Sequence, residues 1–243
     1  MSTVLLLGAS SDIAVALAKK FASQGFSVQL AARNAQRLQP LRSDLAIRYN
    51  CSCSLHEFDA EQPASHAAFF AALPAIPDIT ISIFGYLGDQ LKGESDWSEC
   101  QRIITVNYTG AVSILNIVAN SYVARGEGTI VGISSVAGER GRQSNYLYGS
   151  AKAGFTAYLS GLRNRLFQKK IHVLTVQPGF VYTRMTEGLP LPKLLTSTPA
   201  LVADTVYKAI RKKNNVIYVK WFWRWIMLII KSIPEPIFKK LKL

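Results

Sequence analysis

Short apolar runs alternate with longer helical patterns along most of this chain, and this alternation constrains the fold more than any other feature. The expected strands cover residues 4–7, 27–31, 52–58, 79–84, 129–133, 171–176 and 216–219, and the expected helices cover residues 13–24, 34–49, 97–124 and 148–168. Strands separated by helices favour right-handed βαβ units and a parallel sheet with helices on both faces. We therefore expect one α/β domain over residues 1–220, with a doubly wound parallel sheet of about seven strands.

The composition is consistent with a globular chain in a reducing compartment. The chain has 243 residues, of which 49% are hydrophobic, so it is long enough to bury a full core. Cys51, Cys53 and Cys100 are an odd number of cysteines and do not predict a disulfide framework. Cys51 and Cys53 lack the partner ligands of a zinc site, so no metal is expected. Residues 4–7 are too few for a signal peptide, and we expect a cytoplasmic protein.

Candidate ligand-binding residues follow the expected strands one after another. Ligands of doubly wound sheets bind outside the carboxyl ends of the strands. In chain order these positions hold Gly8, Ser10, Ser11 and Ile13, then Arg33, Asp59, Gly85, Ser135, and finally Pro178, Val181 and Thr183. The first group opens a helix, whose N-terminal amides are suited to bind phosphate. The sequence therefore predicts a nucleotide site along this edge of the sheet.

Tyr148 and Lys152 are four residues apart, so they lie on one face of the expected helix. An ammonium beside a phenol favours the phenolate and would lower the pKa of Tyr148 from about 10. The Ser135 hydroxyl, thirteen residues upstream, could bind a carbonyl oxygen at the same place. A Tyr-x-x-x-Lys pattern alone is more often a solvated helix face. The residues after the other strands favour the catalytic interpretation, proton transfer to a carbonyl during its reduction.

Together these residues resemble the short-chain dehydrogenase/reductase family. The matching elements are Gly8-Ala9-Ser10-Ser11-x-Ile13, Asn107 in Val-Asn-Tyr-Thr-Gly, Ser135, Tyr148-x-x-x-Lys152 and Pro178-Gly179-x-Val181-x-Thr183. They occur in the family's order and cover about residues 3–183. The resemblance implies a Rossmann fold and an NAD(P)-dependent oxidoreductase acting on alcohol or ketone groups. It also implies a homo-oligomer, paired through the helices at 97–124 and 148–168.

The resemblance implies four catalytic residues. Tyr148 would be the general acid, Lys152 would bind the nicotinamide ribose and Ser135 would orient the substrate oxygen. Asn107 would bind a water that relays protons to Lys152; without the resemblance, Asn107 reads as a helix-interior amide bonded to backbone.

It also implies the binding residues of the cofactor. Gly8, Ser10, Ser11 and Ile13 would lie along the adenosine and pyrophosphate. Asp59 would accept a hydrogen bond from the adenine amino group, and Gly85 would pack on the adenine ribose. Thr183, with Pro178 and Val181, would bind the carboxamide. Two glycines of the family's phosphate loop are replaced by Asp12 and Ala14. An aspartate near a pyrophosphate is unfavourable unless its carboxylate points away.

Arg33 bears on the choice of cofactor. NAD-specific sites tend to have an acid after the second strand, whereas an arginine there suits a 2′-phosphate. We therefore expect NADP(H) to be preferred, with NAD(H) possible. The alternative is that Arg33 stacks on adenine and accepts both cofactors.

A narrower resemblance covers nearly the whole chain. The segments 84–89, 106–109, 137–140 and 184–185, and the ending from Phe222, are similar to decaprenylphospho-β-D-erythro-pentofuranosid-2-ulose 2-reductases. This implies reduction of the 2-keto group of a polyprenyl-phosphate-linked pentose, the second step of an epimerisation in cell-envelope polysaccharide synthesis, with a partner flavin oxidase for the first step. Two alternatives remain: a short-chain reductase of another hydrophobic alcohol or ketone, and a non-catalytic nucleotide-sensing scaffold.

Two C-terminal segments complete the expectations. Residues 183–200 contain an apolar, proline-rich stretch that predicts a mobile lid over the substrate. Residues 221–243 form a basic and apolar tail that follows the domain, and residues 205–243 carry +9 of the net charge of +13. The run at 221–230 is shorter than the about 20 residues that span a bilayer. Its tryptophans and basic edge favour an amphipathic helix on the inner face of the cell membrane; the alternative is a helix that packs on the core or a partner subunit. The apolar run argues against nucleic acid.

Overall fold

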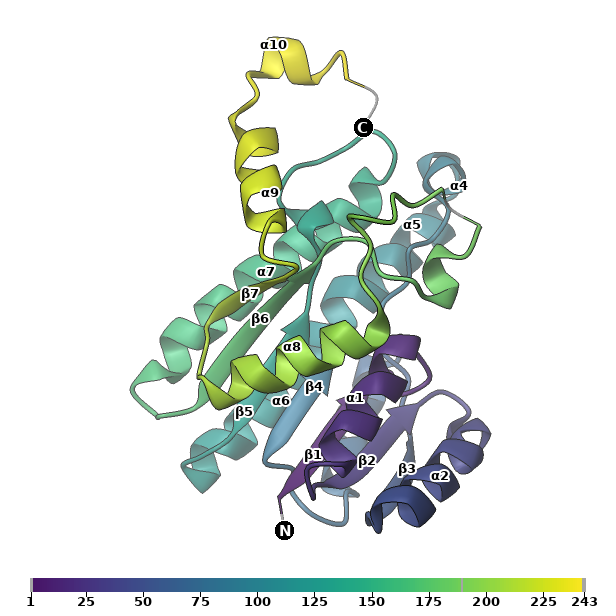
Figure 1. Cartoon of the computed structure of the whole chain (residues 1–243), viewed down its shortest axis with the longest axis vertical. Helices are drawn as coiled ribbons and strands as arrows, with labels where there is room; N and C mark the ends of the chain where they lie inside the picture. Colours follow the sequence, from purple (N-terminus) through teal and green to yellow (C-terminus); the bar gives the residue numbers. More distant parts are fainter. Residues whose placement is uncertain (1, 189, 242–243) are drawn as a thin grey trace.

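The computed structural model describes residues 2–188 and 190–241, in which seven parallel strands form one sheet (Figure 1). The strands are β1 (Thr3–Leu7), β2 (Ser27–Ala32), β3 (Cys53–Glu57), β4 (Ile79–Ser82), β5 (Thr129–Ile133), β6 (His172–Pro178) and β7 (Val216–Val219). Their order is β3-β2-β1-β4-β5-β6-β7, so the direction of winding reverses between β1 and β4. The predicted doubly wound sheet is confirmed. Leu189 of the predicted lid, Lys242 and Leu243 of the predicted tail, and Met1 lie outside the described residues.

Helices cover both faces of the sheet. They are α1 (Asp12–Ala22), η1 (Ala35–Leu38), α2 (Gln39–Tyr49), η2 (Pro63–Ser65), α3 (His66–Ala71), α4 (Gln90–Ser95), α5 (Trp97–Ile104), η3 (Thr105–Thr109), α6 (Gly110–Arg125), η4 (Val136–Gly138), α7 (Tyr146–Phe167), η5 (Arg184–Thr186), α8 (Pro199–Arg211), α9 (Trp223–Ser232) and α10 (Glu235–Phe238). Successive side chains of β1 point to opposite faces of the sheet. Val4 and Leu6 pack with α1 and α8, and Leu5 and Leu7 pack with α6 and α7. Because both faces are buried, this strand reads as a continuous apolar run.

The long helix predicted at 97–124 is interrupted by a π-helical segment. The N–H of Gly110 donates to the carbonyl of Thr105, which makes η3 a π turn between α5 and α6. Among the described residues, Trp97–Arg125 is the one helix long and apolar enough to cross a bilayer. Half of its apolar window is buried, and α6 packs on the sheet through residues such as Ile114 and Val118. We therefore describe it as a core helix.

The tail packs on the domain through one face of α9 and is exposed on the other. Trp223 and Met227 are buried against Val136. The exposed apolar side chains of α9 are Trp225, Leu228 and Ile229, and Trp221 just before the helix is exposed as well. Beyond α9, the short helix α10 lies at the far end of the molecule from the chain's N-terminus (Figure 1). The predicted division at residue 220 stays a prediction, but α9 shares an apolar cluster with the strands and loops before it.

Candidate active site

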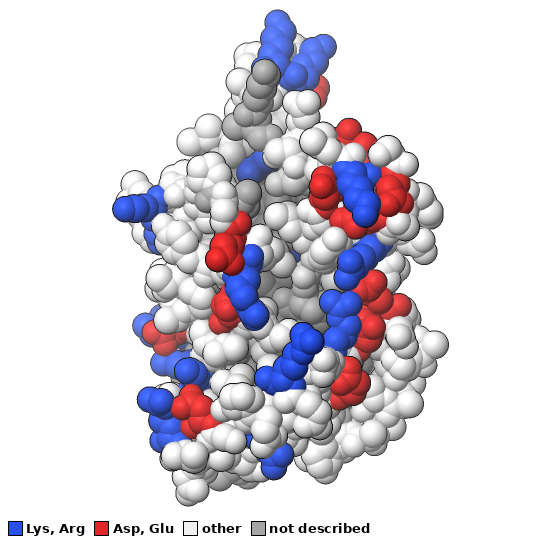
Figure 2. All heavy atoms as spheres, turned by 90° about the vertical axis from the view of Figure 1, so that its right-hand side faces the viewer, with Lys and Arg blue, Asp and Glu red and all other residues white. Residues whose placement is uncertain are grey.

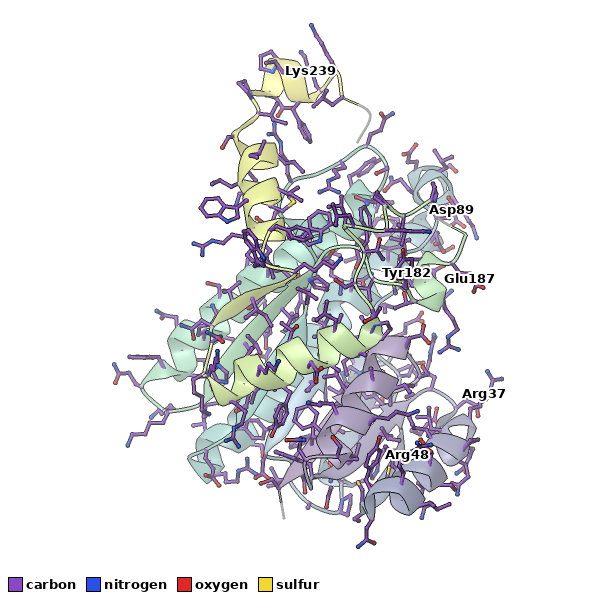
Figure 3. All side chains as sticks on the ribbon, viewed as in Figure 1. Arg37, Arg48, Asp89, Tyr182, Glu187 and Lys239 are labelled. Carbon is purple, nitrogen blue, oxygen red and sulfur yellow. The ribbon has the colours of Figure 1, made fainter. Side chains whose placement is uncertain are left out.

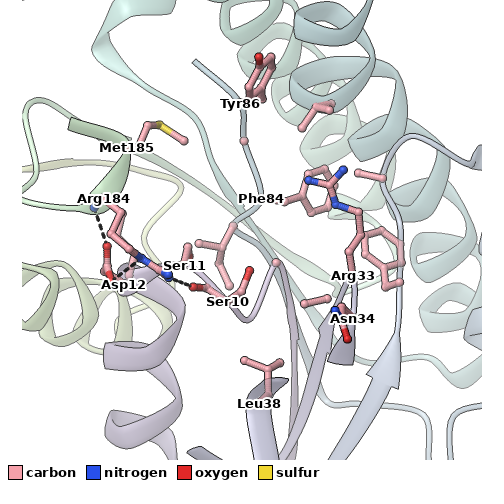
Figure 4. Close-up of a pocket in the computed structure, with 18 of the residues that line it drawn as sticks. Ser10, Ser11, Asp12, Arg33, Asn34, Leu38, Phe84, Tyr86, Arg184 and Met185 are labelled. Carbon is pink, nitrogen blue, oxygen red and sulfur yellow. Dashed lines mark hydrogen bonds and ion pairs between the residues drawn. The ribbon is translucent and has the colours of Figure 1, made fainter. Parts of the chain in front are cut away.

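A cavity of about 910 Å³ lies at the carboxyl ends of β1, β2, β3 and β4 (Figure 4). Eight of the predicted cofactor residues line it: Gly8, Ser10, Ser11, Ile13, Arg33, Asp59, Gly85 and Thr183. These residues come from five separate segments of the chain, and the fold brings them together as the topology predicts. Basic and acidic side chains alternate on the face of the molecule that Figure 2 shows, around a hollow.

The loop between β1 and α1 is built for a close approach of backbone. Gly8 has a φ of +91°, and a Cβ added there would lie 2.6 Å from the backbone nitrogen of Phe84, so this position requires glycine. The Ser11 hydroxyl accepts from the N–H of Ala14 at 3.2 Å and caps α1. Ala14, which replaces a family glycine, is fully buried in the core. The first amides of α1 have no acceptor within the helix, and this cradle fits a dinucleotide phosphate.

Lys152 lies beside Gly85, and Tyr148 and Ser135 adjoin it; none of the three is among the residues that line the cavity. Lys152 is 3% exposed, and its Nζ donates to the carbonyl of Ile133 at 3.2 Å. Nζ lies 5.7 Å from the centroid of the Tyr148 ring. A Cβ placed on Gly85 would be 3.6 Å from that Nζ, so the lysine adjoins the cavity wall. A hydrogen bond links the Tyr148 phenol to Ser135.

Burial dominates the protonation of this group. It raises the pKa of Tyr148 to about 12, and the hydrogen bond with Ser135 opposes that effect only in part. Burial also lowers the pKa of Lys152 to about 8. The sequence predicted that Lys152 lowers the pKa of Tyr148; in the structure the lowering contribution comes from Ser135, and desolvation exceeds it.

Asn107 fixes the chain next to Gly85. It lies in η3, and its Nδ2 donates to the carbonyls of Tyr86 and Ile103 at 2.6 and 2.8 Å. Its Oδ1 accepts from the N–H of Tyr86 at 3.2 Å. The amide bonded to backbone, which was the alternative interpretation, is therefore what the structure contains. The water relay to Lys152 stays a prediction.

Arg33 belongs to a charged group that the sequence did not reveal. Its Nη1 lies 2.8 Å from Oε1 of Glu61, and Nε of Arg102 lies 3.3 Å from the same oxygen. Asp59 positions this glutamate, since Oδ1 of Asp59 accepts from the N–H of Glu61 at 2.9 Å. Arg37 also lines this end of the cavity and points outward (Figure 3). No local pattern marks Glu61, because it lies 28 and 41 positions away from the two arginines.

Pro178 and Val181 lie outside the cavity lining. Pro178 is paired with Val219 in the sheet, and Val181 is buried, with its carbonyl accepting from the Thr186 hydroxyl at 2.7 Å. They support the base of the lid, here defined as residues 183–197. The backbone N–H of Tyr182 donates to the carbonyl of Ser197 at 3.0 Å, so the two ends of the lid lie side by side.

The lid is attached at two further places. Near its start, the backbone N–H of Arg184 donates to Oδ2 of Asp12 at 2.8 Å (Figure 4). Near its end, the carbonyl of Leu194 accepts from Nζ of Lys220 at 2.6 Å, and the carbonyl of Leu195 accepts from Nε1 of Trp223 at 3.2 Å. The Asp12 carboxylate thus faces the lid, which answers the concern about an aspartate in the phosphate loop.

Comparisons with known proteins agree with this geometry. A family model described as short chain dehydrogenase matches residues 2–192. An uncharacterized oxidoreductase of Mycobacterium tuberculosis (strain ATCC 25618 / H37Rv) is 34% identical over 241 residues, covering 98% of this chain and 96% of the relative. An uncharacterized oxidoreductase of Streptomyces coelicolor is 32% identical over 243 residues, covering 98% and 95%. These names specify no substrate.

A solved structure extends the agreement to the whole fold. The short-chain dehydrogenase from Sphingobium yanoikuyae, solved in complex with NADPH, is 26% identical, covers 97% of both chains and superposes with a TM-score of 0.82. The family match is consistent with the parallel sheet and with the cavity at the carboxyl ends of its strands. This chain belongs to the short-chain dehydrogenase family of NAD(P)-dependent oxidoreductases.

Proposed function

We propose that this chain is an NADPH-dependent reductase that transfers a hydride to a ketone. The observation that carries the proposal is that Ser135, Tyr148 and Lys152 adjoin one another, with Lys152 next to Gly85 of the cavity wall. A proton donor, a hydroxyl that can bind oxygen and a buried cation are the groups that carbonyl reduction needs.

The protonation states support reduction. Bound NADPH supplies the hydride. The Tyr148 phenol is protonated at neutral pH, because burial raises its pKa to about 12, so it has a proton to give to the developing alkoxide. Ser135 orients the ketone oxygen toward that phenol. Lys152, next to Gly85, binds the ribose hydroxyls and places positive charge where negative charge develops.

NADPH is the proposed cofactor because arginines line the adenosine end of the cavity. Arg33, Arg37 and Arg102 all contribute to the lining. A 2′-phosphate could bind between guanidinium groups through charge-assisted hydrogen bonds, whereas a ribose hydroxyl gains much less from them. The relative from Sphingobium yanoikuyae, solved with NADPH, supports this choice.

Turnover with a panel of hydrophobic ketones tests the reductase proposal. Tyr148→Phe should lower kcat by 100-fold or more, in line with the loss of a general acid. Tyr146→Phe is the matched control, because this half-exposed tyrosine lies two residues away on the same helix and should retain activity. If the wild-type chain binds NADPH but oxidises none with any ketone, a nucleotide-sensing scaffold replaces the proposal.

For the substrate we propose the 2-keto group of a polyprenyl-phosphate-linked pentose. The support is the narrower sequence resemblance together with the apolar side chains of the lid, such as Leu194, which is 78% exposed. A flavin oxidase would produce this ketone. NADPH oxidation by the lipid-linked keto-pentose, compared with a sterol ketone and an acyl ketone, separates this substrate from the other hydrophobic candidates.

We further propose that α9 binds the surface of an anionic membrane. Trp221, Trp225, Leu228 and Ile229 recur at helical spacing on the side opposite to buried Trp223, and Arg224 and Lys231 flank them. Apolar and aromatic side chains with a basic edge are typical of helices that lie in the lipid interface. Lys239 extends from the tip of the tail, away from the labelled cavity residue Arg37 (Figure 3).

Flotation with liposomes tests this surface. Trp225→Ser combined with Ile229→Ser should abolish binding to vesicles containing anionic lipid, because both side chains are exposed and outside the core cluster. Point changes are preferable to truncation, since truncation would also remove Trp223 and Met227 from the core. Ile47→Ser, at an isoleucine that is 86% exposed on α2, is the control. Equal flotation of the wild type, the double variant and the control would disprove membrane binding by α9.

Finally, we propose a homo-oligomer paired through α5, α6 and α7. Trp97 on α5 and Phe167 at the end of α7 are both exposed, at 69% and 75%. Light scattering of the purified chain measures its mass in solution; a monomer at all concentrations would contradict the pairing.

A further inference from the structure

Arg184 reaches from the lid into the phosphate loop. Its guanidinium donates to the carbonyl of Ser10, and its Nε lies 3.4 Å from Oδ1 of Asp12. Its backbone N–H donates to the other oxygen of the same carboxylate at 2.8 Å. Figure 4 shows the Arg184 side chain extending toward Ser10, with Asp12 next to it. Two backbone segments 172 positions apart are joined by this one pair.

This contact lies at the phosphate cradle, where the pyrophosphate of a bound dinucleotide would place negative charge. Asp12 is the first residue of α1, and the amides of this helix end are the phosphate cradle. An unpaired carboxylate there would repel a pyrophosphate. The guanidinium of Arg184 compensates the charge of Asp12 and retains further N–H groups that can bind phosphate oxygens.

The neighbouring residue extends the contact to the other end of the cavity. A Cβ placed on Gly85 would lie 3.8 Å from Cε of Met185. Consecutive residues of η5 therefore contact the phosphate loop and the wall next to Lys152. Arg33, which Figure 4 shows across the cavity from Arg184, and Arg102 both contact Glu61 at the adenosine end, so they do not serve the phosphate loop.

We propose that Arg184 binds the pyrophosphate of the cofactor and offsets the negative charge of the Asp12 carboxylate beside it. This inference rests on the proposed binding of NADPH but not on any ketone. It assigns to the lid a direct part in cofactor binding, in addition to its predicted place over the substrate.

Calorimetric titration of the full chain tests the proposal without turnover. The probes are NADP⁺, which contains a pyrophosphate, and 2′-AMP, which has the adenosine and the 2′-phosphate but no pyrophosphate. Arg184→Met should raise the Kd of NADP⁺ about 10-fold or more, as expected for a lost charge-assisted contact. It should leave the Kd of 2′-AMP unchanged. Arg211→Met, at an exposed arginine ending α8, removes the same charge elsewhere and should change neither value.

A second variant separates charge from mere attachment of the lid. Asp12→Asn retains an oxygen that can accept from the Arg184 N–H but removes the negative charge, so NADP⁺ should bind at least as tightly as to wild type. Weaker binding in this variant would assign the pair to lid attachment alone and overturn the proposal. So would equal NADP⁺ affinity in wild type and Arg184→Met, or equal weakening of NADP⁺ and 2′-AMP. If wild type binds neither NADP⁺ nor 2′-AMP, the NADPH proposal itself fails. That outcome is distinguishable from a failure of the Arg184 proposal, in which wild type binds both probes.

Discussion

The indole of Trp223 occupies the space that a side chain at Gly179 would need. A Cβ added to Gly179 would clash with the indole atoms Cε2 and Nε1, which leaves only glycine at this position. Gly179 directly follows β6, and Trp223 begins α9, so this contact joins the tail to the catalytic domain. The glycine in the family's Pro-Gly motif thereby has a local packing reason in this chain.

Gly179→Ala should destabilise the fold by about 1–3 kcal/mol, the usual range for overpacking. The added methyl must displace Trp223 and break the bond from its Nε1 to Leu195. Chemical denaturation monitored by tryptophan fluorescence measures the change. Gly161→Ala is the control: no atom lies within 4 Å of a Cβ at this position in α7, so alanine should stabilise by up to about 1 kcal/mol. Equal effects of the two changes would contradict this packing.

Ketone reduction should slow as the pH rises above about 8. The pKa of Lys152 is lowered to about 8 by burial, so the ammonium is present below that pH and is lost above it. The Tyr148 phenol, with its pKa raised to about 12, retains its proton throughout this range. Above the Lys152 pKa, kcat/KM should fall about tenfold per pH unit.

The residual activity of Lys152→Arg should be nearly constant from pH 6.5 to about 9.5, because arginine stays protonated. A limb near pH 8 that persists in this variant would assign the titration to another group. The pH profile at saturating NADPH distinguishes the two outcomes.

Glu61 should oppose the preference for NADPH that Arg33 provides. Its Oε1 interacts with both Arg33 and Arg102, so a 2′-phosphate competes with this carboxylate for the same cations. Glu61→Gln should therefore raise the ratio of kcat/KM for NADPH over NADH several-fold. Arg33→Met should lower that ratio about 10-fold. An unchanged ratio in both variants would place the discrimination elsewhere.

Arg140 should secure the tail to the loop after β5. Its Nη1 donates to the carbonyls of Ile230 and Ile233 at 2.5 and 2.6 Å, and its Nη2 lies 3.0 Å from Oε2 of Glu235. Its guanidinium also lies 3.6 Å from the centroid of the Phe238 ring. Arg140→Met should cost about 1–3 kcal/mol and increase hydrogen exchange in residues 230–238.

Lys239→Met is the matched control for the tail. This lysine is exposed directly after α10, so its loss should cost less than about 1 kcal/mol. Faster exchange along the whole tail in this control, equal to that in Arg140→Met, would contradict the specific part of Arg140.

The sequence predicted best the features that depend on local spacing. Tyr148 and Lys152 are one helical turn apart, so their proximity follows from the helix alone. All seven strands were predicted within a few residues, because buried parallel strands read as apolar runs. The short helices α3 and α4 were missed, since neither is long enough to display a helical period.

Contacts between distant segments could not be predicted in this way. Asp12 appeared as an unfavourable substitution, and its partner Arg184 was only part of a resembling segment. The amide of Asn107 bonds to Tyr86, and no pattern connects a helix position with a loop 21 residues earlier. Likewise, the apolar residues of α9 extend around most of the helix, with Arg224 and Lys231 as its basic residues, so the sequence could not tell which apolar face packs inward. The indole of Trp223 against Gly179 decides that.

The lid is attached both to the phosphate loop and to the tail, so binding of the cofactor and attachment of the tail are coupled equilibria. Arg184 joins the lid to the phosphate loop, and Leu194 and Leu195 join it to Lys220 and Trp223. A displacement of α9 would break the bonds from Lys220 and Trp223 to the lid, and a displaced lid would change the contact of Arg184 with the phosphate loop. If attachment of the tail raises the affinity for the cofactor by some factor, then bound cofactor must raise the equilibrium constant for attachment of the tail by the same factor.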